Sequence, residues 1–418
     1  MEFQTKKPTH PGQRKLAGHR VCKPKETLDR LRPLLPEMGI TRLADITGLD
    51  TIGIPVAQAV RPMGRSLSVS QGKGRTVEAA LVSAAMESVE IWHAEFADLD
   101  MITATGAELT AAGHRLVDLS DLVPAQHVCA KERAAWQDLP LRWTAGRDLV
   151  SGQTYMVPFE VVHLDLTQPA ETTFLPRSSN ALAGGNTLDE ARASALHEAI
   201  ERDCSADFTQ LDRAAQSARR IDTTALCDRW SSAAGMIDMI GNSGLHVELF
   251  DMTNDIGIPT VNARIFANPS AQASGNTEPG ASGAGTHLDP ETAILRALTE
   301  AAQSRLTKIS GVRDDLESYR YIPQDVSSFA ERLNMMADLM GQRALDFAHD
   351  DRSAGSASED VTRLVEAVKS AGVKQVVSVD LTRKEFGIPV VRIVAPGLGR
   401  IMNGTFERGT RQFPKEVM

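Results

Sequence analysis

The stretch that decides the fold of this chain is Gly184-Gly-Asn186-Thr187-Leu-Asp-Glu190-Ala-Arg-Ala-Ser194-Ala-Leu-His-Glu198-Ala-Ile-Glu201-Arg202. It predicts a glycine turn followed by a helix near residues 188–208, in which Thr187 and Glu190 form a Thr-x-x-Glu capping box. The alanine-rich body of this helix should be buried, yet Glu190, Glu198 and Glu201 fall on one face. Because buried carboxylates are costly unless a cation or hydrogen bonds compensate them, the stretch predicts one wall of a cation-binding cage.

Length and composition set the class of protein. The chain has 418 residues, 42% hydrophobic and 24% charged, which suits one large or two ordinary globular domains. A net charge of −9 argues against a broad nucleic-acid footprint. We expect no membrane span, since no apolar run approaches about 20 residues, and residues 1–20 are a polar leader without the apolar core of a secretion signal.

Cysteine usage points to a reducing compartment. The four cysteines, none of them in a C-x-x-C pair, are Cys22, Cys129, Cys204 and Cys227. We therefore expect neither a zinc site nor a disulfide framework, and a cytoplasmic location.

Around the opening stretch, three further helices are predicted, over residues 25–38, over residues 77–97 and from Asp289-Pro290 onward, where Asp289 is the cap and Pro290 starts the first turn. Residues 212–245 look helical and polar, as in a surface insertion.

Hairpins are predicted at three places along the chain. They cover residues 149–165, with a β-rich run over 159–164 after Pro158, residues 247–265 and residues 376–393. The Gly-, Ala-, Ser- and Asn-rich residues 268–284 predict a loop.

These pieces repeat. The helices align as Glu87-x-x-Glu90, Glu198-x-x-Glu201 and Glu300-x-x-Gln303, and in each copy an alanine stands seven residues before the first glutamate: Ala80, Ala191 and Ala293. Among the hairpins, Asp251-Met-Thr…Gly-Ile-Pro259 and Asp380-Leu-Thr…Gly-Ile-Pro389 are clear copies, and the segment around Pro158 is a fainter one. We predict an α+β fold with three pseudo-repeated helix and β-hairpin units around one centre. Residues 1–60 form an N-terminal segment, 61–400 the main domain and 401–418 a tail.

The face that converges at this centre is acidic. It comprises Glu87, Glu90, Glu190, Glu198, Glu201 and Glu300, together with Asn186 and Gln303. Such carboxylates repel one another unless hard cations lie among them, and Mg²⁺ takes oxygen ligands and commonly brings phosphate with it. Arg202 and Arg296 suit phosphate through their guanidinium donors. The sequence therefore predicts a magnesium–nucleotide site.

Simpler explanations remain for individual residues. Any one of the glutamates is as well explained as a solvated surface residue, and only the threefold recurrence in apolar helices favours a shared site. Lys73, within Gly72-Lys-Gly74, fits a solvated turn or a phosphate contact. Ser83 and Ser194, four residues before the first glutamate of their helices, are small packing residues or hydroxyls that line the pocket.

Taken together, these landmarks resemble the YcaO family of ATP-dependent enzymes that modify peptide backbone amides. The landmarks are Gly72-Lys-Gly74 with Ser83-x-x-x-Glu87-x-x-Glu90, Asn186-Thr-x-x-Glu190 with Glu198-x-x-Glu201-Arg202, and Arg296-x-x-x-Glu300-x-x-Gln303. The resemblance covers about residues 60–400 and implies the YcaO fold, with ATP and Mg²⁺ as cofactors.

From the resemblance and the chemistry of the acidic face, we expect the following site residues. The catalytic residues are Glu198, Glu201, Arg202 and Arg296. The nucleotide contacts are Lys73, Ser83, Asn186, Glu190, Arg296 and Gln303, with Arg20 and Thr27 standing where some family members carry Lys and Ser. The metal ligands are Glu87, Glu90, Glu198, Glu201 and Glu300.

The resemblance also implies a reaction class. Such enzymes phosphorylate the oxygen of a peptide amide with ATP, after which a nucleophile adds to the carbon and phosphate leaves. The chain ends in Gln412-Phe-Pro414-Lys-Glu-Val-Met418 without a Pro-x-Pro-x-Pro tail, and residues 300–315 resemble the thioamide-forming, TfuA-associated members. We expect thioamide formation on a ribosomal peptide or protein, with a TfuA-like partner, a sulfur donor and a possible homodimer, and no nucleic-acid or membrane partner. The alternatives are an azoline-forming cyclodehydratase with a separate partner and a non-catalytic nucleotide-binding scaffold.

Overall fold

A computed structural model describes residues 15, 20–122, 136–172, 174–267, 280–312, 344–402, 405–407 and 409. Within these residues the chain is an α+β protein in which every sheet is antiparallel. Most of the polar leader, residues 313–315 of the TfuA-like segment and the end of the tail lie outside the described residues. No helix in the described part of the chain combines the length and the apolar character that crossing a membrane requires.

The predicted repeat exists as three units, each with a hairpin, an edge strand and a long helix. The first unit contains β1 (Arg42–Asp45), β2 (Val56–Val60), β3 (Val69–Lys73) and α2 (Val77–Glu95). The second contains β8 (Leu245–Asp251), β9 (Thr260–Ala267), β10 (Ala281–Thr286) and α11 (Pro290–Ser310). The third contains β11 (Val377–Asp380), β12 (Val390–Val394), β7 (Leu182–Gly184) and α6 (Leu188–Gln210). In the third unit the hairpin follows its helix in the chain by about 170 residues, so this unit is assembled from remote segments.

The hairpin turns are equivalent in their hydrogen bonds. In each, a threonine hydroxyl accepts the N–H of the residue after the Gly-Ile-Pro proline: Val56 N to Thr47 Oγ1 at 3.1 Å, Thr260 N to Thr253 Oγ1 at 3.1 Å and Val390 N to Thr382 Oγ1 at 3.2 Å. The glycine of each Gly-Ile-Pro is left-handed, with φ of 79° at Gly53, 71° at Gly257 and 62° at Gly387. The third hairpin copy is therefore Asp45–Pro55, and the prediction that placed it around Pro158 is wrong.

Glycines let each edge strand approach its own helix. A Cβ on Gly72 would lie 2.0 Å from the backbone N of Ala84, and one on Gly285 would lie 2.5 Å from the N of Ala297. Likewise, a Cβ on Gly185, the residue after β7, would lie 2.5 Å from the backbone N of Ala191. This packing explains why residues 281–284, which the small-residue composition predicted as loop, form strand β10 instead: the small side chains are what close strand–helix contact requires.

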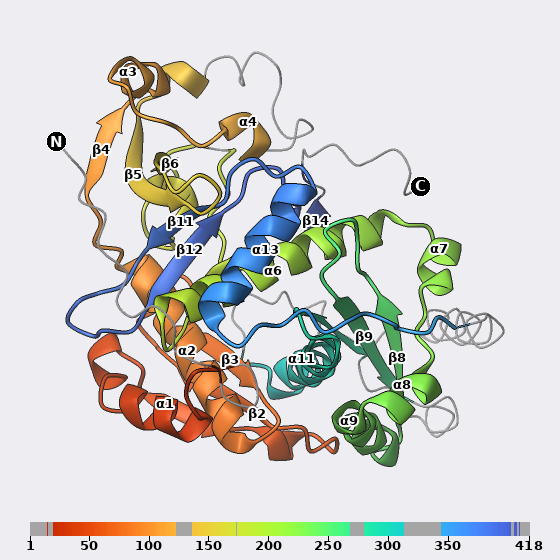
Figure 1. The fold of residues 1–418 in the computed structure, drawn as a ribbon. Helices are drawn as coiled ribbons and strands as arrows, with labels where there is room; N and C mark the ends of the chain where they lie inside the picture. The colour runs from red at the N-terminus through yellow and green to blue at the C-terminus, as the bar shows by residue number, and fades with distance from the viewer. Residues whose placement is uncertain are drawn as a thin grey trace.

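The three units close into a ring. Helix α2 packs on β7, α6 packs on β10 and α11 packs on β3, so that each helix contacts its own strand and the strand of the next unit. Figure 1 shows α6 crossing the middle of the molecule, with β11 and β12 on one side of it and β8 and β9 on the other. Three buried apolar clusters fill the spaces between the sheets and these helices.

The β11–β12–β7 sheet is extended by strands that have no counterpart in the other units. β5 (Leu141–Asp148) pairs with β11, and β4 (Met101–Ala104) and β6 (Thr154–Pro158) pair with β5. The β-rich run predicted over 159–164 is wrong, because it begins with the 3₁₀ turn η5 (Phe159–Val161) and belongs to no strand. Short helical turns cover this lobe: α3 (Gly106–Ala111), α4 (Leu119–Leu122) and η4 (Trp136–Asp138).

Two helical regions differ from their predictions. The helix expected over 25–38 ends early, as α1 (Pro24–Leu31) followed by η1 (Pro36–Met38), because proline interrupts helical hydrogen bonding. Residues 212–245 are helical, as α7 (Arg213–Ala218), α8 (Thr223–Arg229) and α9 (Ser231–Asn242), but they are more than a surface insertion, since Leu226, Met236 and Ile240 are buried against β8, β9 and α11.

The remaining elements complete the structure. The 3₁₀ turn η2 (Thr47–Leu49) lies in the first hairpin, and α13 (Ala357–Ser370) packs on α6. The short hairpin of β13 (Arg400–Met402) and β14 (Thr405–Glu407) also contacts α6. The first sheet continues across the domain boundary expected at residue 60, because β2 pairs with β3.

Candidate functional site

The predicted acids meet where the ring of units closes. The free edges of strands β3 and β7 donate backbone N–H groups to helix α2: Gln71 N to Glu87 Oε2 at 3.3 Å and Gly184 N to Glu90 Oε1 at 2.6 Å. Lys73, at the end of β3, donates to Glu300 Oε2 of α11 at 2.6 Å. Residues from all three units therefore contribute to one region.

Helix α6 supplies the charged residues between the other two helices. Arg202 donates to Glu198 at 3.2 Å and to Glu201 at 3.1 Å. Glu201 is 2% exposed, and its Oε2 has no hydrogen-bond partner among the described residues, nor do Nε of Arg202 and Nε of Arg296. We call the following set the central site: Lys73, Glu87, Glu90, Glu198, Glu201, Arg202, Arg296 and Glu300.

The pKa shifts in the central site follow from burial and crowding. Burial raises the pKa of Glu90 well above its usual range, and the nearby Glu87 and Glu198 raise it further, while the hydrogen bond from Gly184 N opposes them. The pKa of Glu201 is raised by burial and by Glu300. In the absence of a ligand, ionisation of these two carboxylates therefore destabilises the folded protein.

The pKa values of Glu300 and Arg202 shift in the directions that favour their charged forms. Burial acts to raise the pKa of Glu300, but Lys73 and Arg202 outweigh it and the pKa is lowered. Burial acts to lower the pKa of Arg202, but Glu201 and Glu198 outweigh it and the pKa is raised. Arg202 is therefore held in the charged state by the carboxylates it faces.

A second corner of the site surrounds the turn before α6. Thr27 Oγ1 donates to Asn186 Oδ1 at 2.9 Å, Asn186 Nδ2 donates to Glu190 Oε1 at 3.1 Å, and Arg20 Nη1 donates to the same oxygen at 3.0 Å. The structure thus brings Arg20 and Thr27 to Asn186 and Glu190, and the role of these four residues as nucleotide contacts stays a prediction. Arg30 also reaches Asn186 Oδ1, at 2.7 Å, and sequence reasoning missed it because it lies one helical turn beyond Thr27 without a repeat partner.

The capping box at the start of α6 is only half formed. Thr187 Oγ1 accepts the N–H of Glu190 at 3.1 Å, as predicted. The Glu190 carboxylate does not return to the cap; it accepts from Arg20 and from Val21 N instead. The long-range partners win because a buried carboxylate, 4% exposed here, gains more from a cation than from a neutral N–H.

Equivalent positions of the three helices differ in chemistry. Ser83 on α2 corresponds to Ser194 on α6 and to Arg296 on α11, and Ser194 accepts from Arg20 at 3.0 Å. Gln303 corresponds to Glu90 and Glu201, and its backbone carbonyl accepts from the Thr307 hydroxyl at 2.8 Å. The ring is thus symmetric in backbone but not in charge.

Three unpartnered atoms of the central site fit a magnesium–nucleotide complex. Among the described residues, no three acidic, histidine or cysteine side chains are already close enough to hold a metal on their own. The unpartnered Oε2 of Glu201 can coordinate a cation or accept a hydrogen bond from a cation-bound water. The unpartnered Nε atoms of Arg202 and Arg296 can donate to phosphate. The assignment of individual metal ligands stays a prediction.

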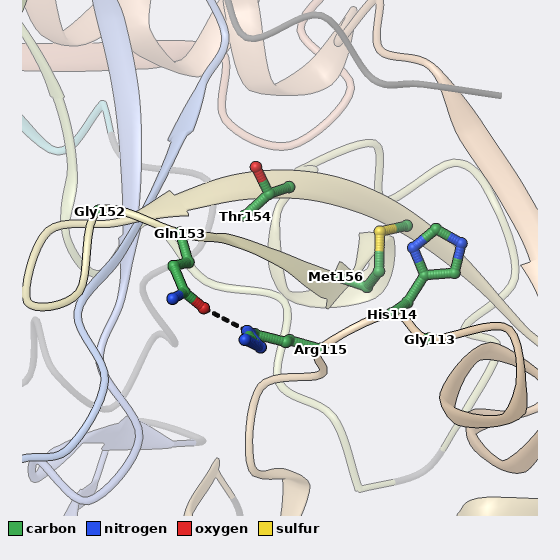
Figure 2. Close-up of a pocket in the computed structure, with 7 residues that line it drawn as sticks. All are labelled: Gly113, His114, Arg115, Gly152, Gln153, Thr154 and Met156. Atoms are coloured by element: carbon green, nitrogen blue, oxygen red, sulfur yellow. Dashed lines mark hydrogen bonds between the residues drawn. The ribbon is translucent and has the colours of Figure 1, made fainter.

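A separate cavity lies on the β5–β6 lobe. It encloses ≈ 430 Å³ and is lined by Gly113, His114, Arg115, Gly152, Gln153, Thr154 and Met156. Figure 2 shows Arg115 hydrogen-bonded to Gln153 at one side of it, with His114 and Met156 at the other. This lining contains no carboxylate and none of the predicted site residues, so it is not the candidate site.

Comparison with known proteins identifies the family. The profile described as YcaO cyclodehydratase, ATP- and Mg²⁺-binding, matches residues 71–399. A protein of Rhizobium leguminosarum bv. trifolii, named for its place in the tfuA 3′ region, is 36% identical over 391 residues, covering 93% of this chain and 90% of the relative. A protein of Methanothermobacter thermautotrophicus is 32% identical over 387 residues, covering 90% of this chain and 94% of that one.

Solved structures agree. The YcaO protein from Methanopyrus kandleri, bound with AMPPCP and Mg²⁺, is 25% identical with a TM-score of 0.70, covering 91% of this chain and 92% of that chain. A heterocyclase in complex with substrate and cofactor shares the fold, at 23% identity and a TM-score of 0.77; the match covers 96% of this chain but 56% of that longer one. The chain therefore belongs to the YcaO family of ATP- and Mg²⁺-binding enzymes that modify peptide amides.

Proposed function

We propose that this enzyme converts a backbone amide of a ribosomal peptide or protein into a thioamide. The observation that carries the choice of reaction is the relative from the tfuA 3′ region, which is 36% identical over 93% of this chain. In this proposal a TfuA-like protein works with the enzyme and a separate donor supplies sulfide.

The proposed reaction balances as follows. The amide oxygen bonds to the γ-phosphorus of ATP and ADP leaves. Hydrosulfide then adds to the amide carbon, the C–O bond breaks, and inorganic phosphate departs with the oxygen and the proton that hydrosulfide brought. When bound, ATP would supply the phosphoryl group and Mg²⁺ would neutralise its charge, so the protein contributes positioning and electrostatics.

The chain's own residues have roles that follow from their contacts. Arg202 is held by Glu198 and Glu201, which leaves its unpartnered Nε free to donate to a phosphate oxygen. Arg296 has an equally unpartnered Nε on the neighbouring helix. We assign both arginines to charge stabilisation during transfer, and Glu198 and Glu201 to orienting Arg202 and holding the cation.

The remaining predicted residues serve binding in this proposal. Asn186 and Glu190 form the corner that Arg20 and Thr27 close, and we assign that corner to the nucleotide. Lys73, Ser83 and Gln303 complete the nucleotide contacts, while Glu87, Glu90 and Glu300 share the cation with Glu198 and Glu201.

An azoline-forming reaction is the second candidate. It is supported by the cyclodehydratase description of the family profile and by the shared fold with a heterocyclase. There a Cys, Ser or Thr side chain of the substrate, rather than sulfide, would attack the activated amide carbon. The non-catalytic scaffold is a third possibility, and it predicts no ATP turnover.

One experiment separates the three. The enzyme is incubated with ATP, Mg²⁺, sulfide and a precursor peptide encoded beside its gene, with and without a neighbouring TfuA-like protein. Exchange of oxygen for sulfur adds about 16 Da to the peptide, whereas dehydration removes about 18 Da. A loss of mass without sulfide would reject thioamide formation, and the absence of peptide-stimulated ADP release would favour the scaffold.

A further inference from the structure

Gln71 breaks the threefold repeat beside the central site. By the offsets that align the helices, Gln71 of β3 is equivalent to Leu182 of β7 and Ala284 of β10. Both of those side chains are apolar and buried. Gln71 is just as buried, at 2% exposed. One unit therefore carries a carboxamide where the other two carry hydrocarbon.

The contacts of Gln71 join two helices of the central site. Its backbone N–H donates to Glu87 of α2 at 3.3 Å, and its side-chain oxygen contacts the Thr307 hydroxyl of α11. In a strand, residues 71 and 73 share a face, so the carboxamide lies on the side from which Lys73 reaches Glu300.

The orientation of the carboxamide follows from counting protons. Thr307 Oγ1 also lies 2.8 Å from the Gln303 carbonyl, and a hydroxyl has one proton to give. Turning the amide of Gln71 by 180° lets its N–H donate to Thr307 while Thr307 donates to Gln303, and amide orientation is decided by such networks. After this turn, Oε1 of Gln71 occupies the former position of the amide nitrogen, where the described residues offer no hydrogen-bond partner.

An acceptor oxygen buried on a strand whose backbone N–H bonds Glu87 of the central site needs a donor. Leaving it unsatisfied costs about 1–3 kcal/mol, and Mg²⁺ in protein sites usually keeps several of its waters. We propose that Oε1 of Gln71 accepts a hydrogen bond from a water molecule bound to magnesium in the central site. This inference rests on the ATP and Mg²⁺ binding of the family and not on the thioamide proposal.

The test is the magnesium dependence of nucleotide binding. Calorimetric titration with AMPPCP at increasing Mg²⁺ measures the magnesium concentration needed for half-maximal affinity. For Gln71→Leu we expect that concentration to rise about tenfold, the equivalent of losing one hydrogen bond. Thermal stability should hold or rise, since leucine occupies the equivalent position 182.

Three further variants make the outcome decisive. Gln71→Glu keeps an acceptor, so its AMPPCP binding should need no more magnesium than that of the wild type. A magnesium requirement higher than that of Gln71→Leu would overturn the acceptor role. Gln58→Leu is the matched control, because Gln58 pairs with Gln71 in register and bonds Ser310 of the same helix at 3.0 Å. The proposal would be overturned if Gln58→Leu and Gln71→Leu raised the magnesium requirement equally, or if Gln71→Leu did not raise it. Gln71→Met replaces Gln71→Leu if the latter does not fold.

Discussion

Buried carboxylates occur in two different settings in this protein. Away from the centre, Glu95 faces Arg61 and Asp50 faces Arg305, and in both ion pairs the two side chains are at most 3% exposed. In the central site, Glu201 is as deeply buried, yet it has a raised pKa and an oxygen without a partner in the described structure. The first kind of acid is complete within the fold, and the second awaits a ligand.

The difference matters because burial alone does not distinguish a structural acid from a functional one. Glu95 accepts from Arg61 Nη2 at 2.7 Å and from Ser66 N at 2.8 Å, so its partners come from the protein. Glu201 shares Arg202 with Glu198, and the nearby Glu300 opposes its charge. Replacing each acid by its amide therefore gives opposite predictions.

The largest expected effect is on catalysis at Glu201. Glu201→Gln should lower ATP turnover by at least about 10³-fold, since a preorganised charge at a phosphoryl-transfer site is lost. The free energy of unfolding should stay the same or rise, because the variant removes a buried charge that the protein does not fully compensate. Steady-state ADP release and urea unfolding measure the two quantities. Turnover at the wild-type rate would reject the central site as the place of catalysis.

The matched change in the peripheral pair should act on stability. Glu95→Gln leaves the Arg61 guanidinium buried without its counter-charge, which we expect to cost about 3–5 kcal/mol of unfolding free energy. ATP turnover per folded molecule should change less than about twofold at a temperature where the variant is folded. A variant as stable as the wild type would show that the peripheral pair is no more complete than the central one.

Much of this arrangement could be predicted from the sequence, because the repeat is written in residue types. Alanine and glutamate recur at fixed offsets in three helices, and those offsets also relate the backbone bonds of Gly74 to Pro55, Gly185 to Pro389 and His287 to Pro259, all at 3.1 Å. Acids facing one centre followed from that periodicity alone.

The hairpin of the first unit was missed for a physical reason. Its Asp-Ile-Thr47 and Gly53-Ile-Pro motifs are separated by five residues, against three after Thr253 and four after Thr382. Turn length can vary without changing the bonds that define the turn, so a fixed spacing does not find it. The motif Asp-x-Thr followed by Gly-Ile-Pro with a variable gap would have found all three copies.

Other features depend on contacts that local sequence does not contain. The third unit joins β7 to β12 across about 200 residues, and no local pattern specifies that pairing. Likewise, Arg20 and Val21 hold Glu190 from 170 and 169 residues away, so the incomplete capping box could not be predicted from the turn itself.

The smallest predicted effect is the pH dependence of stability without ligand. The pKa values of Glu90 and Glu201 are raised, so the folded protein binds their protons more tightly than the unfolded chain. Stability contributed by these groups is full below the ordinary value of 4.5 and is lost as pH rises through the raised values. Each unit of upward shift corresponds to about 1.4 kcal/mol lost above it.

Thermal unfolding between about pH 5 and pH 8 measures this loss. Glu90→Gln and Glu201→Gln should each reduce the fall in melting temperature relative to the wild type, whereas Glu95→Gln should not. Saturating AMPPCP and Mg²⁺ should also reduce the fall, because the bound cation favours the charged carboxylates. Curves for the two central variants that run parallel to the wild type would show that these acids carry no buried charge to relieve, and the distinction between the two kinds of buried carboxylate would then rest on hydrogen bonding alone.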